Sequence, residues 1–194
     1  MVRTDSPYKT LKDLIDAARS KPGTVTFASP GNGTVAHLAG VRLQNAAGVK
    51  MEHIPYKGSA GALPDLLGGS VDIYLASVPS VQGQIAAGKM RALAVTSLKR
   101  SPILPNVPAI AETYPGFDAV TWFGVLMPAG TPKPIINTMN EAINAALKSQ
   151  DVRAKIAAEG GEVLGGTPEE FGKLIRSEIG TWGTLVRESG AKVD

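Results

Sequence analysis

Hydrophobic positions in the first half of the chain recur with two alternating spacings. Apolar residues in the stretch 10–20 have helical spacing after Thr10, and Pro22 ends this stretch. Short apolar runs typical of buried strands then alternate with further helical stretches. The predicted strands are 24–28, 50–54, 71–75 and 91–95, and the predicted helices between them are 35–47, 62–67 and one through Gln84 and Ile85. This alternation predicts an α/β fold with a parallel sheet.

The second half of the chain has a different pattern. Prolines interrupt the stretch 97–119 and exclude regular structure over much of it. An apolar run over 120–128 is predicted to be another strand. The rest is predicted to be helical, with apolar stripes over 135–147 and 171–186. Because this helical tail has few strands of its own, we expect its apolar faces to need a partner surface.

Composition indicates a folded globular protein and excludes several classes of function. Of the 194 residues, 43% are hydrophobic and 19% are charged, and the net charge of +3 is spread along the chain. We therefore expect no nucleic-acid partner. Cysteine is absent, and the two histidines, His37 and His53, lack metal-ligand spacing, so we expect no metal and no cofactor.

The ends of the chain carry no targeting or membrane signal. No apolar stretch approaches the roughly 20 residues that span a bilayer, and the first ten residues do not have the pattern of a signal peptide. The expectation at this point is either a cytoplasmic protein or a processed chain.

A glycine-rich segment, SPGNGTVAHLAG, joins the first predicted strand to the next helix. Ser29, Asn32 and Thr34 offer side-chain donors there, and Gly31 and Gly33 allow a ligand close to the backbone. Free N–H groups at the helix start add the positive end of its dipole, so the segment could hold a carboxylate. The alternative is a glycine-rich turn in which Thr34 is an ordinary N-cap.

The same segment also resembles a dinucleotide fingerprint. Gly31 and Gly33 are followed by Ala36 at the spacing of that motif, and Glu52 lies about as far downstream as the ribose-binding acid. The match is loose because Glu52 falls in the middle of a predicted strand. It leaves a nucleotide-dependent oxidoreductase as the alternative function.

Two further strand-to-helix junctions follow. The segment PYKGSAG has a full charge at Lys57, with Gly58 opening a helix, and loops after neighbouring parallel strands share one edge of a sheet. In LASVPS, Ser77 could donate a hydrogen bond. Trp122 could line a cleft. Lys57 could instead be a solvated surface lysine, Ser77 an ordinary helix cap and Trp122 a core residue.

Since no nucleophile, base or metal set is visible in the sequence, binding is favoured over catalysis.

Several segments, in order and correctly spaced, resemble the substrate-binding proteins of tripartite tricarboxylate transporters, the Bug-type solute receptors. They include FASPGNGTVAHLAG, HIPYKGSAGALPDLLGGSVDI and GGTPEEFGKLIRSEIGTWG, and the resemblance runs from Ser6 to Asp194. It implies a non-enzymatic, periplasmic receptor with the type II periplasmic-binding-protein fold. Such a receptor closes around a small mono- or dicarboxylate and presents it to membrane permease subunits.

The resemblance also implies a domain organisation. Residues 1–8 would be a crossover strand, 9–118 a complete α/β ligand-binding lobe (domain 2), and 119–194 the return crossover with the C-terminal helical part of domain 1. The rest of domain 1, the N-terminal half-domain, and a signal peptide would be absent. We therefore expect the C-terminal helices to self-associate or to dock in a non-native place.

The resemblance gives the loops specific roles. Its ligand-binding positions are Ser29, Gly31, Asn32, Gly33 and Thr34 in the first loop and Tyr56, Lys57 and Gly58 in the second, to which the residue-based reasoning adds Ser77 and Trp122. Many family members have an Asp-Asn pair where this chain has Ala76-Ser77. The missing acid disfavours a ligand with an amine and favours a plain carboxylate.

Overall fold

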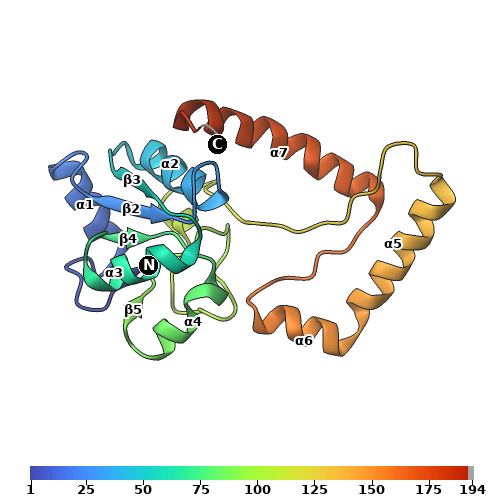
Figure 1. Cartoon of the computed structure of the whole chain (residues 1–194), viewed down its shortest axis with the longest axis horizontal. Helices are drawn as coiled ribbons and strands as arrows, with labels where there is room; N and C mark the ends of the chain where they lie inside the picture. The colour runs from blue at the N-terminus through green and yellow to red at the C-terminus, as the bar shows by residue number, and fades with distance from the viewer. Residues whose placement is uncertain (192–194) are drawn as a thin grey trace. The chain divides into compact units, whose positions relative to one another are not determined.

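The computed structural model describes residues 1–191 and divides into two compact units. The first unit comprises Met1–Val120 and the chain from Thr184 onward, and the second comprises Thr121–Gly183. Within the described residues, all strands belong to the first unit, and the second contains helices and extended connections (Figure 1).

The first unit is α/β, as the sequence predicts. Its elements are β1 (Val2–Arg3), α1 (Leu11–Ser20), β2 (Thr26–Ser29), α2 (Val35–Ala47), β3 (Glu52–Pro55), α3 (Ser59–Gly68), β4 (Ile73–Tyr74), α4 (Val78–Ala86), β5 (Met90–Arg91) and the short 3-10 helix η1 (Ile110–Glu112). The predicted strands are shorter than expected. The fourth is displaced to Met90–Arg91, and Val95 makes only an isolated bridge to Ala109.

A parallel sheet in the strand order β3–β2–β4 forms the centre of this unit. Its register pairs Phe27 of β2 with His53 of β3, and Ala28 of β2 with Tyr74 of β4. The predicted parallel arrangement is confirmed. The strand expected over residues 1–8 is limited to Val2–Arg3, which pairs antiparallel with β5.

The two faces of the sheet are covered by different helices. Side chains alternate along a strand, so Ala28 and Phe27 face opposite sides. Ala28 belongs to a buried cluster with Leu66 of α3 and Val81 of α4. Phe27 is fully buried against α2, where Gly40 leaves room for its ring. Both faces are therefore packed, as a parallel sheet requires.

Local signals set the helix ends. At the start of α1, the Thr10 hydroxyl accepts from the N–H of Asp13, and the Asp13 carboxylate accepts from the N–H of Thr10, which is a capping box. Helix α2 ends at Gly48 and α3 at Gly69, both in the left-handed conformation that glycine adopts at little cost.

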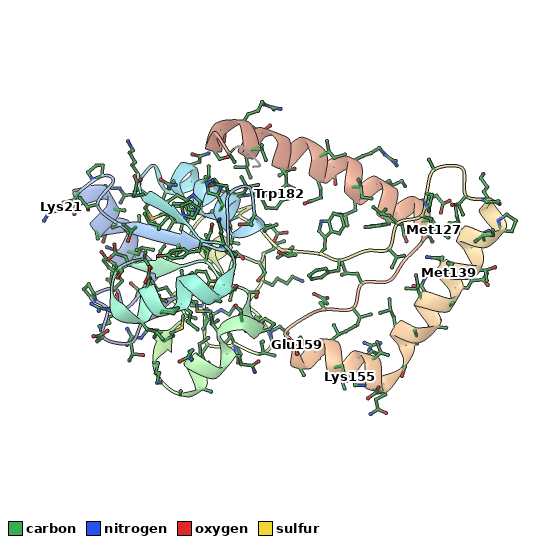
Figure 2. All side chains as sticks on the ribbon, in the orientation of Figure 1. Lys21, Met127, Met139, Lys155, Glu159 and Trp182 are labelled. Carbon is green, nitrogen blue, oxygen red and sulfur yellow. The ribbon has the colours of Figure 1, made fainter. Side chains whose placement is uncertain are left out.

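The second unit contains α5 (Lys133–Lys148), α6 (Gln150–Ala158) and most of α7 (Pro168–Ser189). Both predicted apolar stripes are helical. No residue of α5 or α6 is buried, and Met139 projects from α5 (Figure 2). The Asn144 side chain fixes the chain before α7 to α5, because it donates to the Gly166 carbonyl and accepts from the Gly166 N–H.

The predicted strand over 120–128 is wrong. This segment has no strand pairing, and Phe123 in its centre is 95% exposed. An apolar, extended segment becomes a strand only when a neighbouring strand pairs with its backbone groups. Among residues 121–183 the structure has no strand that could do so.

Candidate functional site

The loops that follow β2, β3 and β4 open at the same edge of the sheet, because the three strands are parallel. We call residues 30–34 the first loop, 56–58 the second loop and 75–77 the third loop. The first two touch directly: the Gly58 N–H donates to the Pro30 carbonyl at 2.9 Å. All three lie within the first unit, and each leads into a helix.

Side chains that bond to the backbone shape the first loop. Ser29 is fully buried, and its hydroxyl donates to the Gly31 carbonyl at 3.0 Å and accepts from the Gly31 N–H at 3.2 Å. The Thr34 hydroxyl donates to the same carbonyl at 2.7 Å and accepts from the His37 N–H at 3.3 Å, so Thr34 is the N-cap of α2. Both hydroxyls thus hold the loop, and their direct contact with a ligand stays a prediction.

The backbone of the first loop keeps donors free. Gly33 has a φ of +70°, which favours glycine, and its N–H donates to Nδ1 of His37. Among the described residues, the N–H groups of Asn32, Val35 and Ala36 form no hydrogen bond. These three amides lie at the positive end of α2, where an anion is stabilised.

The second loop combines open amides with a cation. Gly58, with a φ of +93°, is the N-cap of α3 and provides no side-chain cap, so the N–H groups of Ser59 and Ala60 have no intrahelical or capping partner. Lys57 is exposed and forms no ion pair with the described residues. A positive charge therefore stands at a helix start that a side chain does not cap.

Tyr56 in the second loop stabilises α3. Its hydroxyl donates to Asp65 at 2.6 Å, and burial together with this bond raises the pKa of Tyr56 to about 12. Gly61 lies against the Tyr56 ring, because a Cβ on Gly61 would come within 3.1 Å of Cδ1 of that ring. The hydroxyl of Tyr56 is thus engaged with the protein, and its contact with a ligand stays a prediction.

The third loop resembles the second in lacking a side-chain cap. Ser77 is the N-cap of α4, but its hydroxyl donates to the Ser80 hydroxyl at 3.2 Å instead of capping the helix. Ser80 in turn donates to the Ser77 carbonyl at 2.8 Å, and Pro79 occupies the first turn. The start of α4 is therefore also open to a partner.

Trp122 belongs to the second unit. Its ring packs edge-on against Phe171 of α7, with 5.4 Å between the ring centroids. Its role in lining a ligand cleft stays a prediction.

A pair of stacked histidines lies beside the first loop. The rings of His37 and His53 are nearly parallel, 3.8 Å apart, and the Phe27 ring lies beside them, with its centroid 4.7 Å from that of His53 and 6.4 Å from that of His37. His53 Nε2 is 2.7 Å from the Ser29 hydroxyl. Sequence analysis considered the two histidines only as metal ligands and missed this connection to the loop. The connection depends on the strand register, which pairs His53 with Phe27, two residues before Ser29.

The surroundings of the two histidines favour the neutral form of each ring. Burial lowers the pKa of His37. Burial, with a smaller contribution from His37, lowers the pKa of His53 to about 4. Neither ring has a metal-ligand set: residues 1–191 contain no group of three or more histidine or acidic side chains placed to hold a metal ion.

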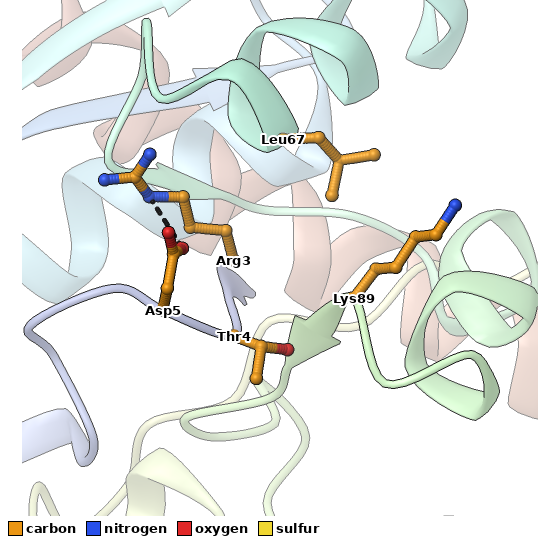
Figure 3. A pocket seen from close by; sticks show the side chains of 5 residues that line it. All are labelled: Arg3, Thr4, Asp5, Leu67 and Lys89. Carbon is orange, nitrogen blue, oxygen red and sulfur yellow. Dashed lines mark ion pairs between the residues drawn. The ribbon is translucent and has the colours of Figure 1, made fainter.

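A shallow cavity of about 470 Å³ lies elsewhere in the first unit. It is lined by Arg3, Thr4, Asp5, Leu67 and Lys89 (Figure 3). The Arg3 guanidinium is 3.1 Å from the Asp5 carboxylate, so part of the positive charge is already neutralised. None of the three loops contributes to this cavity, and its donors are side chains of an open surface. We place the candidate site at the loops.

Comparison with known proteins identifies the family. The sequence model of TctC, the tripartite tricarboxylate transporter family receptor, matches residues 1–191. The chain belongs to this receptor family. Among curated relatives, a protein encoded between tcbD and tcbE in Pseudomonas sp. strain P51 is 43% identical over 97% of this chain, and BugT of Bordetella pertussis is 42% identical over 95% of it. The chain spans about half the length of these relatives, 56% and 57%.

Solved structures of the family share the fold. A protein of R. palustris solved with adipate has a TM-score of 0.86 and 34% sequence identity, over 98% of this chain and 64% of that one. MatC from Rhodopseudomonas palustris, solved with bound malate, has a TM-score of 0.75 and 28% identity, over 95% of this chain and 64% of that one. The expected α/β fold of the periplasmic-binding-protein type is thereby confirmed.

The alternative of a nucleotide-dependent oxidoreductase is not supported. The matched family is one of transport receptors. Glu52, which would bind the ribose, lies at the start of β3 and is exposed. The fingerprint requires its acid at the carboxyl end of the strand, beside the glycine-rich loop.

Within the described part of the chain, no helix has both the length and the apolarity needed to cross a membrane.

Proposed function

We propose that this chain is the ligand-capturing part of a periplasmic solute receptor that binds a small mono- or dicarboxylate at the first and second loops. The observation that carries the proposal is the pair of adjacent helix starts with unpaired backbone N–H groups, Asn32, Val35 and Ala36 at α2 and Ser59 and Ala60 at α3. The exposed ammonium of Lys57 stands between these helices in sequence.

Physical chemistry supports an anionic ligand. Unpaired N–H groups at a helix start and the helix dipole both favour negative charge. A carboxylate has two oxygens, which accept several such bonds at once, and each charge-assisted bond contributes about 1.5–3 kcal/mol. Because the amides belong to backbone that Ser29 and Thr34 hold in place, little ordering is needed when the ligand binds.

The ligand class follows from the third loop and from the relatives. Ala76 and Ser77 supply no negative charge near the start of α4, so an ammonium group on the ligand would have no partner there. Two structures similar to this chain contain adipate and malate, which are dicarboxylates without an amine. We therefore propose a plain carboxylate, and adipate and malate are the first ligands to test.

The partner and compartment follow from the family. Its members are receptors of tripartite transporters, and we propose that this chain works in the periplasm with membrane permease subunits. We also propose that the apolar faces of the second unit mediate self-association, because Phe123, Leu126 and Ile179 are 95%, 74% and 68% exposed.

Isothermal calorimetry tests the binding proposal. Adipate, malate and NAD are titrated into the wild-type chain, and the account predicts heat from at least one carboxylate and none from NAD. Lys57→Ala should weaken carboxylate binding about tenfold or more, since one charge-assisted contact is lost. Lys50→Ala is the matched control, because Lys50 is an exposed lysine before β3 whereas Lys57 follows that strand. Equal effects of the two changes, or NAD binding alone, would contradict the proposal.

A further inference from the structure

The stacked histidines are linked to the first loop by two hydrogen bonds at different points. His53 reaches the Ser29 hydroxyl at 2.7 Å, and His37 Nδ1 accepts the Gly33 N–H at 3.2 Å. Ser29 and Gly33 bracket the turn that leaves the Asn32 amide unpaired. The two rings contact each other at 3.8 Å, so the two anchors of the loop form one continuous unit.

We infer that His37 and His53 are positioning residues of the first loop: the neutral pair holds Ser29 and Gly33 in place, and protonation of the pair releases the loop and weakens carboxylate binding. This inference rests on the proposed function, because it concerns the regulation of the same site. Neither ring need touch the ligand, since both act through residues of the loop.

The protonation states follow from the hydrogen bonds. Assigning the single hydroxyl proton of Ser29 to the Gly31 carbonyl leaves His53 Nε2 as the donor to the Ser29 oxygen. Nδ1 of His37 accepts from the Gly33 N–H and must therefore be unprotonated. The neutral ring of each histidine satisfies its bond.

Protonation has a specific consequence at His37. An imidazolium carries a proton on both nitrogens, so Nδ1 would then present a donor to the donor of Gly33. That bond is lost, and Gly33 must move. Protonation of His53 instead places a charge against two partly buried rings, the His37 imidazole at 3.8 Å and the Phe27 ring at 4.7 Å. Protonation of either histidine therefore destabilises the conformation of the first loop that the structure shows.

Among residues 1–191, no carboxylate offsets the lowering of the pKa of either histidine. Strand β2 carries no ionisable side chain, and Glu52 of β3 lies on the opposite face of its strand from His53 and is exposed. On α2, the Arg42 guanidinium is bound to the carbonyls of Gly116 and Asp118. Lys57 in the second loop carries the same sign of charge as an imidazolium. The lowered pKa of each histidine agrees with this environment.

The decisive variant is His37→Asn. The asparagine side-chain oxygen can take the place of Nδ1 and accept from the Gly33 N–H, but it cannot be protonated. His37→Leu removes the acceptor at every pH. Glu52→Gln is the matched control, since it removes a titratable group next to His53 on the exposed face of β3. All four proteins are compared with adipate and malate by calorimetry at pH 7.5 and pH 5, at constant ionic strength.

The expected result separates the variants by pH dependence. Wild type and Glu52→Gln should bind more weakly at pH 5 than at pH 7.5, and by a larger factor than His37→Asn, whose change reports the protonation of the ligand itself. His37→Leu should bind weakly at both values. Equal pH dependence in wild type and His37→Asn, or stronger binding by wild type at pH 5, would overturn the inference.

A readout without ligand distinguishes this inference from the proposed function. The protection of the Gly33 amide against hydrogen exchange, corrected for the intrinsic rate, is measured by NMR on the free chain from pH 7.5 to pH 4.5. We expect protection to fall in the wild type and to persist in His37→Asn. If carboxylates do not bind at any pH while this result holds, the proposed function fails and the positioning role stands. Constant protection in the wild type would overturn the role.

Discussion

Gly40 of α2 lies against the ring of Phe27 so closely that a Cβ at Gly40 would be 2.3 Å from Cε2 of that ring. This contact lets α2 cover the face of the sheet on which His53 and Ser29 also lie. Because Gly40 has no side chain, α2, which begins at the first loop, can pack this close to the sheet.

Gly40→Ala should destabilise the chain by about 1–3 kcal/mol, because the added methyl group overpacks a fully buried ring. Gly83→Ala is the matched control: Gly83 lies in α4, and a Cβ there would have nothing within 4 Å. Since alanine is the better helix former, the control should gain roughly 0.5–1 kcal/mol. Urea unfolding measures both free energies. A stabilised Gly40→Ala variant would contradict the described packing.

Thr34→Val should destabilise α2 by about 1 kcal/mol and weaken carboxylate binding. Valine keeps the shape of threonine but removes the hydroxyl that accepts from the His37 N–H and donates to the Gly31 carbonyl. Thr34→Ser keeps the hydroxyl and is the control. Thermal unfolding and calorimetry measure the two effects. If serine and valine behave alike, the hydroxyl does not hold the loop.

The free energy of unfolding should fall as the pH is lowered from about 6.5 to about 4. In the folded state the pKa of His53 is held at about 4, below its ordinary value of 6.5, so in this window the unfolded chain binds a proton that the folded chain does not. His53 therefore contributes roughly 1–3 kcal/mol to the free energy of unfolding above pH 6.5, and this contribution is lost as the pH falls from about 6.5 to about 4.

His53→Gln removes this titration while keeping a donor for Ser29, so its unfolding free energy should depend less on pH than that of the wild type. Urea unfolding at several pH values gives both curves, and the difference between them removes the contribution of carboxylates common to both proteins. Parallel curves would show that His53 is not held neutral in the folded chain.

The second unit should self-associate through its apolar side chains. Ile179 of α7 is 68% exposed, and Ile179→Lys should lower the tendency to form dimers or larger species in sedimentation velocity. Ser177→Lys is the control, since it adds the same charge to α7 at an exposed polar position. A wild-type chain that stays monomeric at all concentrations, or equal effects of both changes, would contradict this expectation.

Much of the first unit could be predicted from the sequence because its signals are local. The stripe after Thr10, the N-cap at Thr34 and the left-handed glycines at Gly48 and Gly69 each specify a helix end within a few residues. The parallel direction of the strands followed from the alternation of elements, and it puts the first and second loops at the same edge of the sheet.

The remaining features depend on contacts between segments far apart in sequence. The run 120–128 has the composition of a strand, but pairing decides whether it forms one, and composition does not contain that information. The role of His53 likewise depends on the strand register that places it beside Ser29, 24 residues earlier. The hydroxyls of Ser29 and Thr34 are bonded to the loop itself, which the sequence did not indicate, and their contact with a ligand stays a prediction.

The central claim is that backbone amides at the starts of α2 and α3 bind a carboxylate. The direct measurement is a titration of the chain with adipate and with malate, followed by ¹H–¹⁵N correlation spectra. The account predicts that the largest shifts occur at the amides of Asn32, Val35, Ser59 and Ala60. Largest shifts around the cavity lined by Arg3 and Lys89, or no shift with either ligand, would contradict it.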